Sequence, residues 1–211
     1  MGPMTSAGVE EYLAGLFAER NPILREMEQI AAEREFPIVG PLVGGLLQVL
    51  SRTANARRIL ELGSGFGYSA FWFAGAISDP GEIVLTDVSA ENLEEAERFL
   101  ARGRFPHRFE RYRGDALDRL RREGDPWDVI FCDIDKHAYP DAIEPAVERL
   151  RPGGLLIFDN MLWSGRVFES AGPGDRATEG VRAAGRKLAA HPALWTTLIP
   201  LRDGVSVSVR T

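Results

Sequence analysis

The chain of 211 residues contains a single cysteine, Cys132, so an internal disulfide is excluded and we expect a reducing, cytoplasmic setting. No apolar stretch is long enough to cross a bilayer, and the first residues lack the basic and apolar regions of a signal peptide. Positive charge is not in excess: 25 Lys and Arg stand against 31 Asp and Glu, a net charge of −6. Because phosphate binding needs a positive field, this balance argues against a nucleic-acid partner.

What the chain does have is two apolar runs that stop on polar residues. The run at 127–132 is followed by Asp133, and the run at 155–158 by Asp159 and Asn160. Runs of this kind are typical of strands buried on both faces, whose carboxyl ends meet at the ligand-binding edge of a parallel sheet. Three oxygen ligands at one edge suit a hard divalent cation. The alternative is that these residues cap the helices that follow.

The order of the predicted elements indicates the fold class. Strands and helices alternate along most of the chain, and Arg202-Asp203-Gly204 is typical of a hairpin turn. We predict an α/β fold with a doubly wound, Rossmann-like sheet of seven strands, mostly parallel with an antiparallel C-terminal strand. The predicted strands are 58–62, 82–86, 109–113, the two apolar runs, 195–201 and 205–210, and the predicted helices between them are 42–50, 68–77, 90–102, 139–150 and 177–190.

We expect one domain over residues 1–211. Its first part, residues 1–35, reads as two helices that are broken at Asn21-Pro22 and act as a cap or lid. The catalytic core would then comprise residues 36–211.

A glycine-rich turn follows the first strand, at Gly63, Gly65 and Gly67. The dinucleotide fingerprint needs a further glycine where this chain has Tyr68, which disfavours a pyrophosphate ligand. Glu61, at the end of the strand, suits an ammonium group instead.

Acidic residues also follow the next two strands. Asp87 stands where an acid accepts hydrogen bonds from ribose hydroxyls. Asp115 and Ala116 come after the third strand, where they could flank an adenine ring. A ligand with an amino-acid tail, a ribose and an adenine but no phosphate is S-adenosylmethionine. Helix capping or solvation is the alternative explanation for Glu61 and Asp87.

At this point the residues resemble a known family, the small metal-dependent class I O-methyltransferases. The family includes catechol and caffeoyl-CoA O-methyltransferases and many bacterial members. The resemblance covers about 36–211 and rests on four pieces of sequence. They are Glu61-x-Gly63-x-x-x-Gly67-Tyr68-Ser69, Asp133-x-Asp135-Lys136-x-x-Tyr139, Asp159-Asn160-x-x-Trp163-x-Gly165-x-Val167 and Pro200-Leu201-x-Asp203-Gly204.

The resemblance implies a role for each matching residue. Asp133, Asp159 and Asn160 would bind Mg²⁺ or another divalent cation such as Mn²⁺ or Ca²⁺, and Lys136 would be the general base. Trp163 and Ser164 are expected to border the acceptor, although Ser164 departs from the family's frequent Asn or Gly, and packing at the sheet edge is the alternative for Trp163. The expected donor contacts are Glu61, Gly63, Ser64, Gly67, Ser69, Asp87, Val88, Asp115, Ala116, Asp133 and Asp135.

The sequence therefore predicts an S-adenosylmethionine-dependent, divalent-metal-dependent O-methyltransferase that acts on a catechol-like small molecule. A bound dication would favour the phenolate and disfavour a charged ammonium on Lys136. Family members are commonly dimers, so we expect a homodimer. No membrane partner is expected, because the chain has no long apolar stretch. The alternatives are a tRNA hydroxyl methyltransferase and a non-catalytic module that binds S-adenosylmethionine.

Two further groups of residues are expected to have no role in the chemistry. The arginines of 102–122 are interrupted by acids, which favours a solvated mixed-charge face over an RNA site. His107, His137 and His191 lack metal-ligand spacing and are expected at the surface, and Cys132 is expected in the core.

Overall fold

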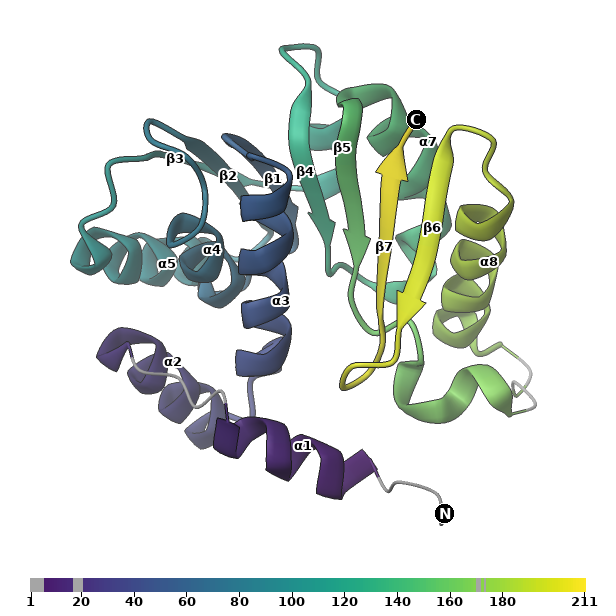
Figure 1. Ribbon diagram of the computed structural model, residues 1–211, viewed down its shortest axis with the longest axis horizontal. Helices are drawn as coiled ribbons and strands as arrows, with labels where there is room; N and C mark the ends of the chain where they lie inside the picture. The colour runs from purple at the N-terminus through teal and green to yellow at the C-terminus, as the bar shows by residue number, and fades with distance from the viewer. Residues whose placement is uncertain (1–5, 17–20, 170–171, 173) are drawn as a thin grey trace.

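A single sheet forms the centre of the described chain, which comprises residues 6–16, 21–169, 172 and 174–211 of a computed structural model. The strands are β1 (Arg58–Leu62), β2 (Glu82–Asp87), β3 (Arg108–Arg113), β4 (Trp127–Cys132), β5 (Leu150–Phe158), β6 (Leu194–Ile199) and β7 (Val205–Arg210). Their order is β3-β2-β1-β4-β5-β7-β6 (Figure 1). Strands β1 to β5 pair in parallel, and β7 is antiparallel to both β5 and β6. The predicted fold class is confirmed.

Helices cover both faces of this sheet. They are α1 (Ser6–Leu16), α2 (Pro22–Glu33), α3 (Gly40–Thr53), α4 (Tyr68–Ala74), α5 (Ala90–Gly103), α6 (Ala116–Leu120), α7 (Tyr139–Arg149) and α8 (Arg176–Ala190), with 3-10 turns η1 (Lys136–Ala138) and η2 (Trp163–Phe168). Helices α2 to α5 share one apolar core with the sheet, and α6 to α8 share the other. Neighbouring residues in β1, Ile59 and Leu60, point into opposite cores. Burial on both faces explains why the strands read as continuous apolar runs.

The N-terminal segment packs onto the body through α2. Asn21 caps this helix by accepting a hydrogen bond from the Ile23 amide at 2.9 Å, and Pro22 occupies its first turn. Leu24 and Met27 are buried in the core beside α4 and α5. The predicted break at Asn21-Pro22 is confirmed as the start of α2. The predicted role of residues 1–35 as a lid stays a prediction, and residues 17–20 lie outside the described part.

Two elements differ from the prediction. The short helix α6 was not predicted, because five residues are too few to show a helical period. Strand β5 begins at Leu150, five residues before the predicted apolar run at 155–158. Helix α7 nevertheless ends at Arg149, next to the predicted boundary. No helix in the described ranges is long and apolar enough to cross a membrane.

Candidate active site

The carboxyl ends of the central strands meet at one edge of the sheet, where main-chain hydrogen bonds hold them together. The Asp133 amide donates to the Leu62 carbonyl at 2.8 Å, and the Asp159 amide donates to the Cys132 carbonyl at 3.2 Å. The residues that follow β1, β4 and β5 are therefore neighbours, as the strand-end argument predicted.

A cleft of about 710 Å³ opens at this edge. The predicted donor, metal, base and acceptor residues that line it are Gly63, Ser64, Ser69, Asp87, Val88, Asp115, Ala116, Asp133, Asp135, Lys136, Asp159, Asn160 and Trp163. We call it the donor cleft. Three predicted site residues lie outside its lining. Glu61 is completely buried, Gly67 stands at the N-terminus of α4 with φ of +87°, and Ser164 lines a second pocket.

Glu61 lies beneath the donor cleft with its carboxylate only half satisfied. One oxygen accepts a hydrogen bond from the Ser69 hydroxyl, and Ser69 itself lines the cleft. The other oxygen, Oε2, has no hydrogen-bond partner within the described ranges. Burial raises the pKa of Glu61 to about 8, against the lowering effect of the hydrogen bond from Ser69. When this buried acid is ionised, its negative charge would compensate a positive charge in the cleft.

Asp87 fixes the glycine-rich turn from the neighbouring strand. Its Oδ2 accepts a hydrogen bond from the Gly65 amide at 3.0 Å, and its Oδ1 accepts one from the Ser89 amide at 2.7 Å. Tyr68, at the position of the missing fingerprint glycine, is buried and donates from its hydroxyl to Glu28 at 2.6 Å. Asp87 therefore holds the glycine-rich turn in place and lines the donor cleft, while its predicted contact with a ribose stays a prediction.

Asp115 caps the helix that follows it. Helix capping was the alternative interpretation of the other acids at strand ends. Its Oδ1 accepts hydrogen bonds from the Leu117 amide at 2.7 Å and the Asp118 amide at 3.4 Å, at the start of α6. It also lines the donor cleft, as does the neighbouring Ala116. The predicted donor contacts of both residues stay predictions.

Asp133 and Asp159 bring two carboxylates close together at the far end of the donor cleft. Asp159 is 4% exposed, and burial followed by the negative charge of Asp133 raises its pKa to about 7. The positive charges of Lys136 and Arg202 oppose this rise. Asn160 lines the same cleft and adopts a left-handed backbone conformation, with φ of +54°. Two acids and an amide are oxygen ligands of the type that Mg²⁺ and Ca²⁺ accept.

Lys136 lies beside the two acids. Its Nζ donates to Asp133 Oδ1 at 2.7 Å and to the Ile134 carbonyl at 3.2 Å. The same nitrogen lies 4.9 Å from the ring centroid of Tyr139 and 5.7 Å from that of Trp163. The side chain is 10% exposed, so Lys136 is not a solvated surface lysine.

The loop that carries Asn160 is fixed by the turn between β6 and β7. The Leu162 amide donates to the Asp203 carbonyl at 2.7 Å, and the Ser164 amide donates to Asp203 Oδ1 at 2.5 Å. Trp163 and Ser164 are both left-handed, with φ of +48° and +52°. These contacts stabilise a backbone conformation that costs free energy in isolation.

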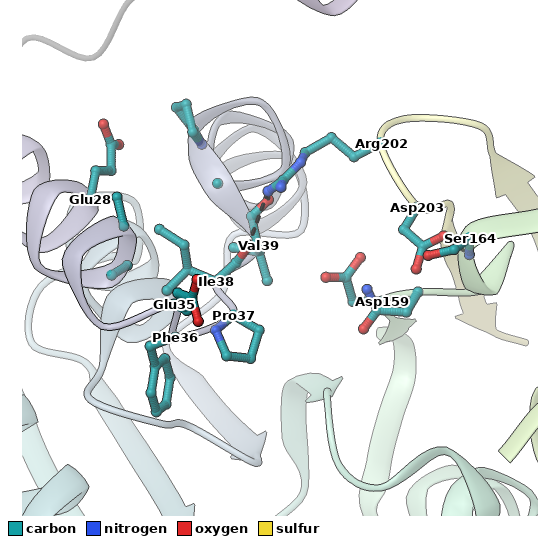
Figure 2. A pocket seen from close by; sticks show the side chains of 15 residues that line it. Glu28, Glu35, Phe36, Pro37, Ile38, Val39, Asp159, Ser164, Arg202 and Asp203 are labelled. Atoms are coloured by element: carbon teal, nitrogen blue, oxygen red, sulfur yellow. Dashed lines mark hydrogen bonds between the residues drawn. The ribbon is translucent and has the colours of Figure 1, made fainter. Parts of the chain in front are cut away.

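A second pocket of about 800 Å³ adjoins the donor cleft and shares Asp159 and Asn160 with it. Figure 2 shows the side chains that surround it. One wall comes from α2 and the segment after it, and the other from Ser164 and the β6–β7 turn. The charged residues here that sequence reasoning assigned no role are Glu28, Glu35, Arg202 and Asp203. The available signal was the Pro200-Leu201-x-Asp203-Gly204 motif, which had been interpreted only as a hairpin and a family match.

The arginines of 102–122 are largely paired with acids. Ion pairs join Arg102 to Glu26 at 2.5 Å, Arg111 to Glu97 at 2.6 Å, Arg108 to Glu82 at 3.0 Å and Arg119 to Glu110 at 3.1 Å. The predicted mixed-charge face is confirmed. This pairing leaves less positive charge for an RNA backbone.

The histidine prediction was wrong at two positions. The His107 side chain is 2% exposed, because its Nδ1 accepts from the Gly81 amide at 3.2 Å while its Nε2 lies 3.0 Å from the Ala74 carbonyl. His191 is also largely buried, and only His137 is exposed. Cys132 is buried in the core, as predicted.

Comparison with known proteins identifies the family. The family model described as O-methyltransferase matches residues 15–211. The chain belongs to the O-methyltransferase family. The predicted enzyme class is therefore confirmed, and the non-catalytic alternative loses its support. A protein of Mycobacterium avium (strain 104) is 32% identical to this O-methyltransferase over 203 residues, which cover 92% of this chain and 91% of that protein.

Two solved structures are similar to this O-methyltransferase over almost its whole length. The O-methyltransferase from Bacillus cereus, in complex with SAH, is 30% identical with a TM-score of 0.86, and 97% of each chain is covered. The O-methyltransferase TomG from Streptomyces achromogenes, involved in tomaymycin synthesis and solved in complex with SAM, is 30% identical with a TM-score of 0.87. That comparison covers 99% of this chain and 100% of TomG.

Proposed function

We propose that this O-methyltransferase transfers a methyl group from S-adenosylmethionine to one hydroxyl of a catechol-like small molecule, with the help of a divalent cation such as Mg²⁺, Mn²⁺ or Ca²⁺. The observation that carries the proposal is the position of Asp159 and Asn160, which line both the donor cleft and the second pocket. Asp133 and Lys136 line the donor cleft beside them. An acceptor in the second pocket would meet the donor at these four residues.

The donor cleft suits S-adenosylmethionine in charge and shape. Glu61, with one unpartnered oxygen, compensates the donor's ammonium through Ser69, and Asp87 accepts hydrogen bonds from the ribose hydroxyls. Val88 and Ala116 border the space left for the adenine. The Bacillus cereus and Streptomyces achromogenes enzymes, which bind SAH and SAM, support the same donor here.

The acidic end of the donor cleft suits a divalent cation. Asp159 is buried beside the charge of Asp133, and a cation would relieve the repulsion that raises the pKa of Asp159. Asp133, Asp159 and Asn160 would hold the ion. When bound, it would stabilise the phenolate form of the acceptor, since a free phenol has a pKa of about 10.

Residues of the chain remove the proton from the acceptor and position it. Lys136 accepts the proton from the reacting hydroxyl, and its Nζ, 2.7 Å from Asp133, already lies at the cation site. Ser164, which the hairpin turn holds in place, borders the acceptor from the second pocket, and Trp163 borders it from the donor cleft. The methyl group then passes directly from sulfur to oxygen, so that positioning supplies much of the rate enhancement.

A comparison of isomeric diphenols tests this proposal. With S-adenosylmethionine and Mg²⁺, the enzyme should methylate ortho-diphenols and leave the matching meta-diphenols and monophenols unchanged, because only adjacent oxygens can bind one cation together. Product formation is measured by mass spectrometry. Equal turnover of the ortho and meta isomers would contradict the acceptor class.

Donor binding should release a proton from Glu61. With its pKa at about 8, this acid is protonated at pH 7 in the unliganded enzyme, and the positive donor favours its ionised form. Binding at pH 7 should therefore release about one proton, and at pH 9 almost none. Titration calorimetry in two buffers of different ionisation enthalpy measures this number.

The Glu61→Gln variant is the control, since it cannot ionise and should release no proton from this position. The raised pKa of Glu61 also makes the stability of the unliganded enzyme depend on pH. Because the folded-state pKa lies above the ordinary 4.5, the contribution of Glu61 to stability is lost as the pH rises through about 8. The unliganded enzyme should therefore unfold at lower temperature at pH 9 than at pH 7. Identical binding enthalpies in both buffers at pH 7 would contradict the assignment.

We also propose a cytoplasmic homodimer without nucleic-acid or membrane partners. The paired arginines of 102–122 favour a small-molecule acceptor over tRNA. The exposed Trp195, on the edge strand β6, is an apolar residue that a second copy could cover. Light scattering on the purified enzyme tests the dimer, and a molar mass near 23.3 kDa would contradict it.

A further inference from the structure

Arg202 connects two walls of the second pocket that are far apart in the sequence. It belongs to the tip of the β6–β7 hairpin, and its side chain reaches across to the segment before α3 (Figure 2). Its Nη1 donates to the Ile38 carbonyl at 3.1 Å and also to the Val39 carbonyl. We call residues 36–40 the wall segment and residues 202–204 the hairpin tip.

The hairpin tip is itself tied to the loop that carries the proposed cation ligand Asn160. Gly204 accepts a hydrogen bond from the Met161 amide at 2.8 Å, and Asp203 accepts one from the Leu162 amide at 2.7 Å. A side chain at Gly204, where φ is +83°, would collide with Leu162. The tip is therefore a fixed point beside Asn160, from which Arg202 extends.

The wall segment is shaped to receive the guanidinium. A β-carbon at Gly40 would overlap the Arg202 guanidinium and displace it, and φ of +72° at this position favours a glycine. At the other end of the segment, the Phe36 ring lies edge-on against Phe66, with centroids 5.1 Å apart. The segment is held by Phe36 near the donor turn and by Arg202 near Asn160.

This segment borders both spaces in which the reaction partners would lie. Phe36, Pro37, Ile38 and Val39 line the donor cleft and the second pocket alike. Among the described residues that line the second pocket, Arg202 is the one with a basic side chain. Its guanidinium donates hydrogen bonds to carbonyls of the wall segment, so its positive charge lies against that segment. Any loosening of this contact would widen the pocket on the side opposite Asp159 and Asn160.

We propose that Arg202 is a positioning residue for the methyl acceptor. By holding the wall segment at a fixed distance from the cation-binding loop, it sets the orientation of the acceptor and so determines which of two adjacent hydroxyls faces the donor. This inference rests on the proposed function, because it places the acceptor in the second pocket. It assigns Arg202 no contact with the reacting atoms.

The test compares Arg202→Met with a matched control, Arg210→Met. Arg210 makes the same kind of contact, from its guanidinium to the Leu150 carbonyl, but it lies at the other end of β7 and lines neither pocket. An unsymmetrical ortho-diphenol such as 3,4-dihydroxybenzaldehyde serves as acceptor, since it gives two distinguishable monomethyl products. Arg202→Lys, which keeps the charge and can reach one carbonyl, is the second variant if Arg202→Met does not fold.

In Arg202→Met we expect the acceptor KM to rise roughly five- to tenfold, because a wall segment that is no longer held by Arg202 binds the acceptor less tightly. The ratio of the two products should move toward equality, and the donor dissociation constant should change by at most about twofold. Arg202→Lys should lie between the parent and Arg202→Met. Arg210→Met should keep the parental KM and product ratio, even if its melting temperature falls. A purely structural role of Arg202 would lower the melting temperature and leave the product ratio unchanged.

Hydrogen–deuterium exchange supplies a measurement that does not depend on turnover. Peptides that cover the wall segment should exchange faster in Arg202→Met than in the parent, and at the parental rate in Arg210→Met. Parental exchange, or a parental KM and product ratio, in Arg202→Met would overturn the inference. Lack of turnover by the parent on every ortho-diphenol would overturn the proposed function, while the exchange rates would still decide whether Arg202 holds the wall.

Discussion

Asp159→Ala should lose turnover almost completely while it keeps its affinity for S-adenosylmethionine. The alanine removes a proposed cation ligand from the end of β5, and the loss of several kcal/mol of charge stabilisation corresponds to about three orders of magnitude in rate. The proposed donor contacts of Glu61 and Asp87 lie on β1 and β2, at a distance from the substitution. Titration calorimetry with S-adenosylmethionine measures the donor affinity, and product formation measures the rate.

The stability of the same variant separates loss of the cation from misfolding. Burial and the charge of Asp133 raise the pKa of Asp159 to about 7, so ionisation of this buried acid lowers the stability of the metal-free fold as the pH rises through that value. Asp159→Ala should therefore melt no lower than the parent at pH 8 without metal. Asp118→Ala, an exposed acid on α6 outside both pockets, is the control and should retain parental activity. Parental turnover by Asp159→Ala would exclude a metal role for this carboxylate.

Lys136→Met should lower kcat by roughly 10²–10⁴ and leave donor affinity nearly unchanged, because it keeps the aliphatic bulk but removes the base. Its pH–rate profile should also change, since the rate in the variant would depend on phenolate already present in solution. Rates measured from pH 6 to 10 at saturating donor and acceptor test this expectation.

Lys187→Met is the matched control for this substitution. Lys187 donates to the Pro140 carbonyl at 3.1 Å and pairs with Glu144 at 3.5 Å, away from both pockets. Its replacement should leave kcat and the pH profile unchanged. If Lys136→Met showed the parental pH profile, another group would have to accept the proton.

The parts of the site that depend on strand ends were predictable from the sequence. A parallel sheet brings the residues after its strands to one edge, so the apolar runs before Asp133 and Asp159 were enough to place both acids together. The positions of the glycines after β1 and of Asp87 at the end of β2 were predictable for the same reason. Such inferences need only the local pattern and the handedness of the βαβ crossover.

Features that depend on contacts between distant segments were not predictable. Two sides of the second pocket are joined by the contact between Arg202 and Val39, which are 163 residues apart in the sequence, and no local pattern links them. The burial of His107 depends on the Gly81 and Ala74 backbones that surround it. The half-satisfied carboxylate of Glu61 depends on side-chain packing beneath the cleft, and only its identity as an acid was visible in the sequence.

Removal and return of the divalent cation tests the central claim most directly. The parent enzyme is freed of metal with a chelator, and methylation of an ortho-diphenol by S-adenosylmethionine is followed while Mg²⁺ is added back. The account predicts negligible turnover without metal, saturable recovery with Mg²⁺ in the parent, and no recovery in Asp159→Ala. Full turnover by the parent in excess chelator would contradict the proposed role of Asp133, Asp159 and Asn160.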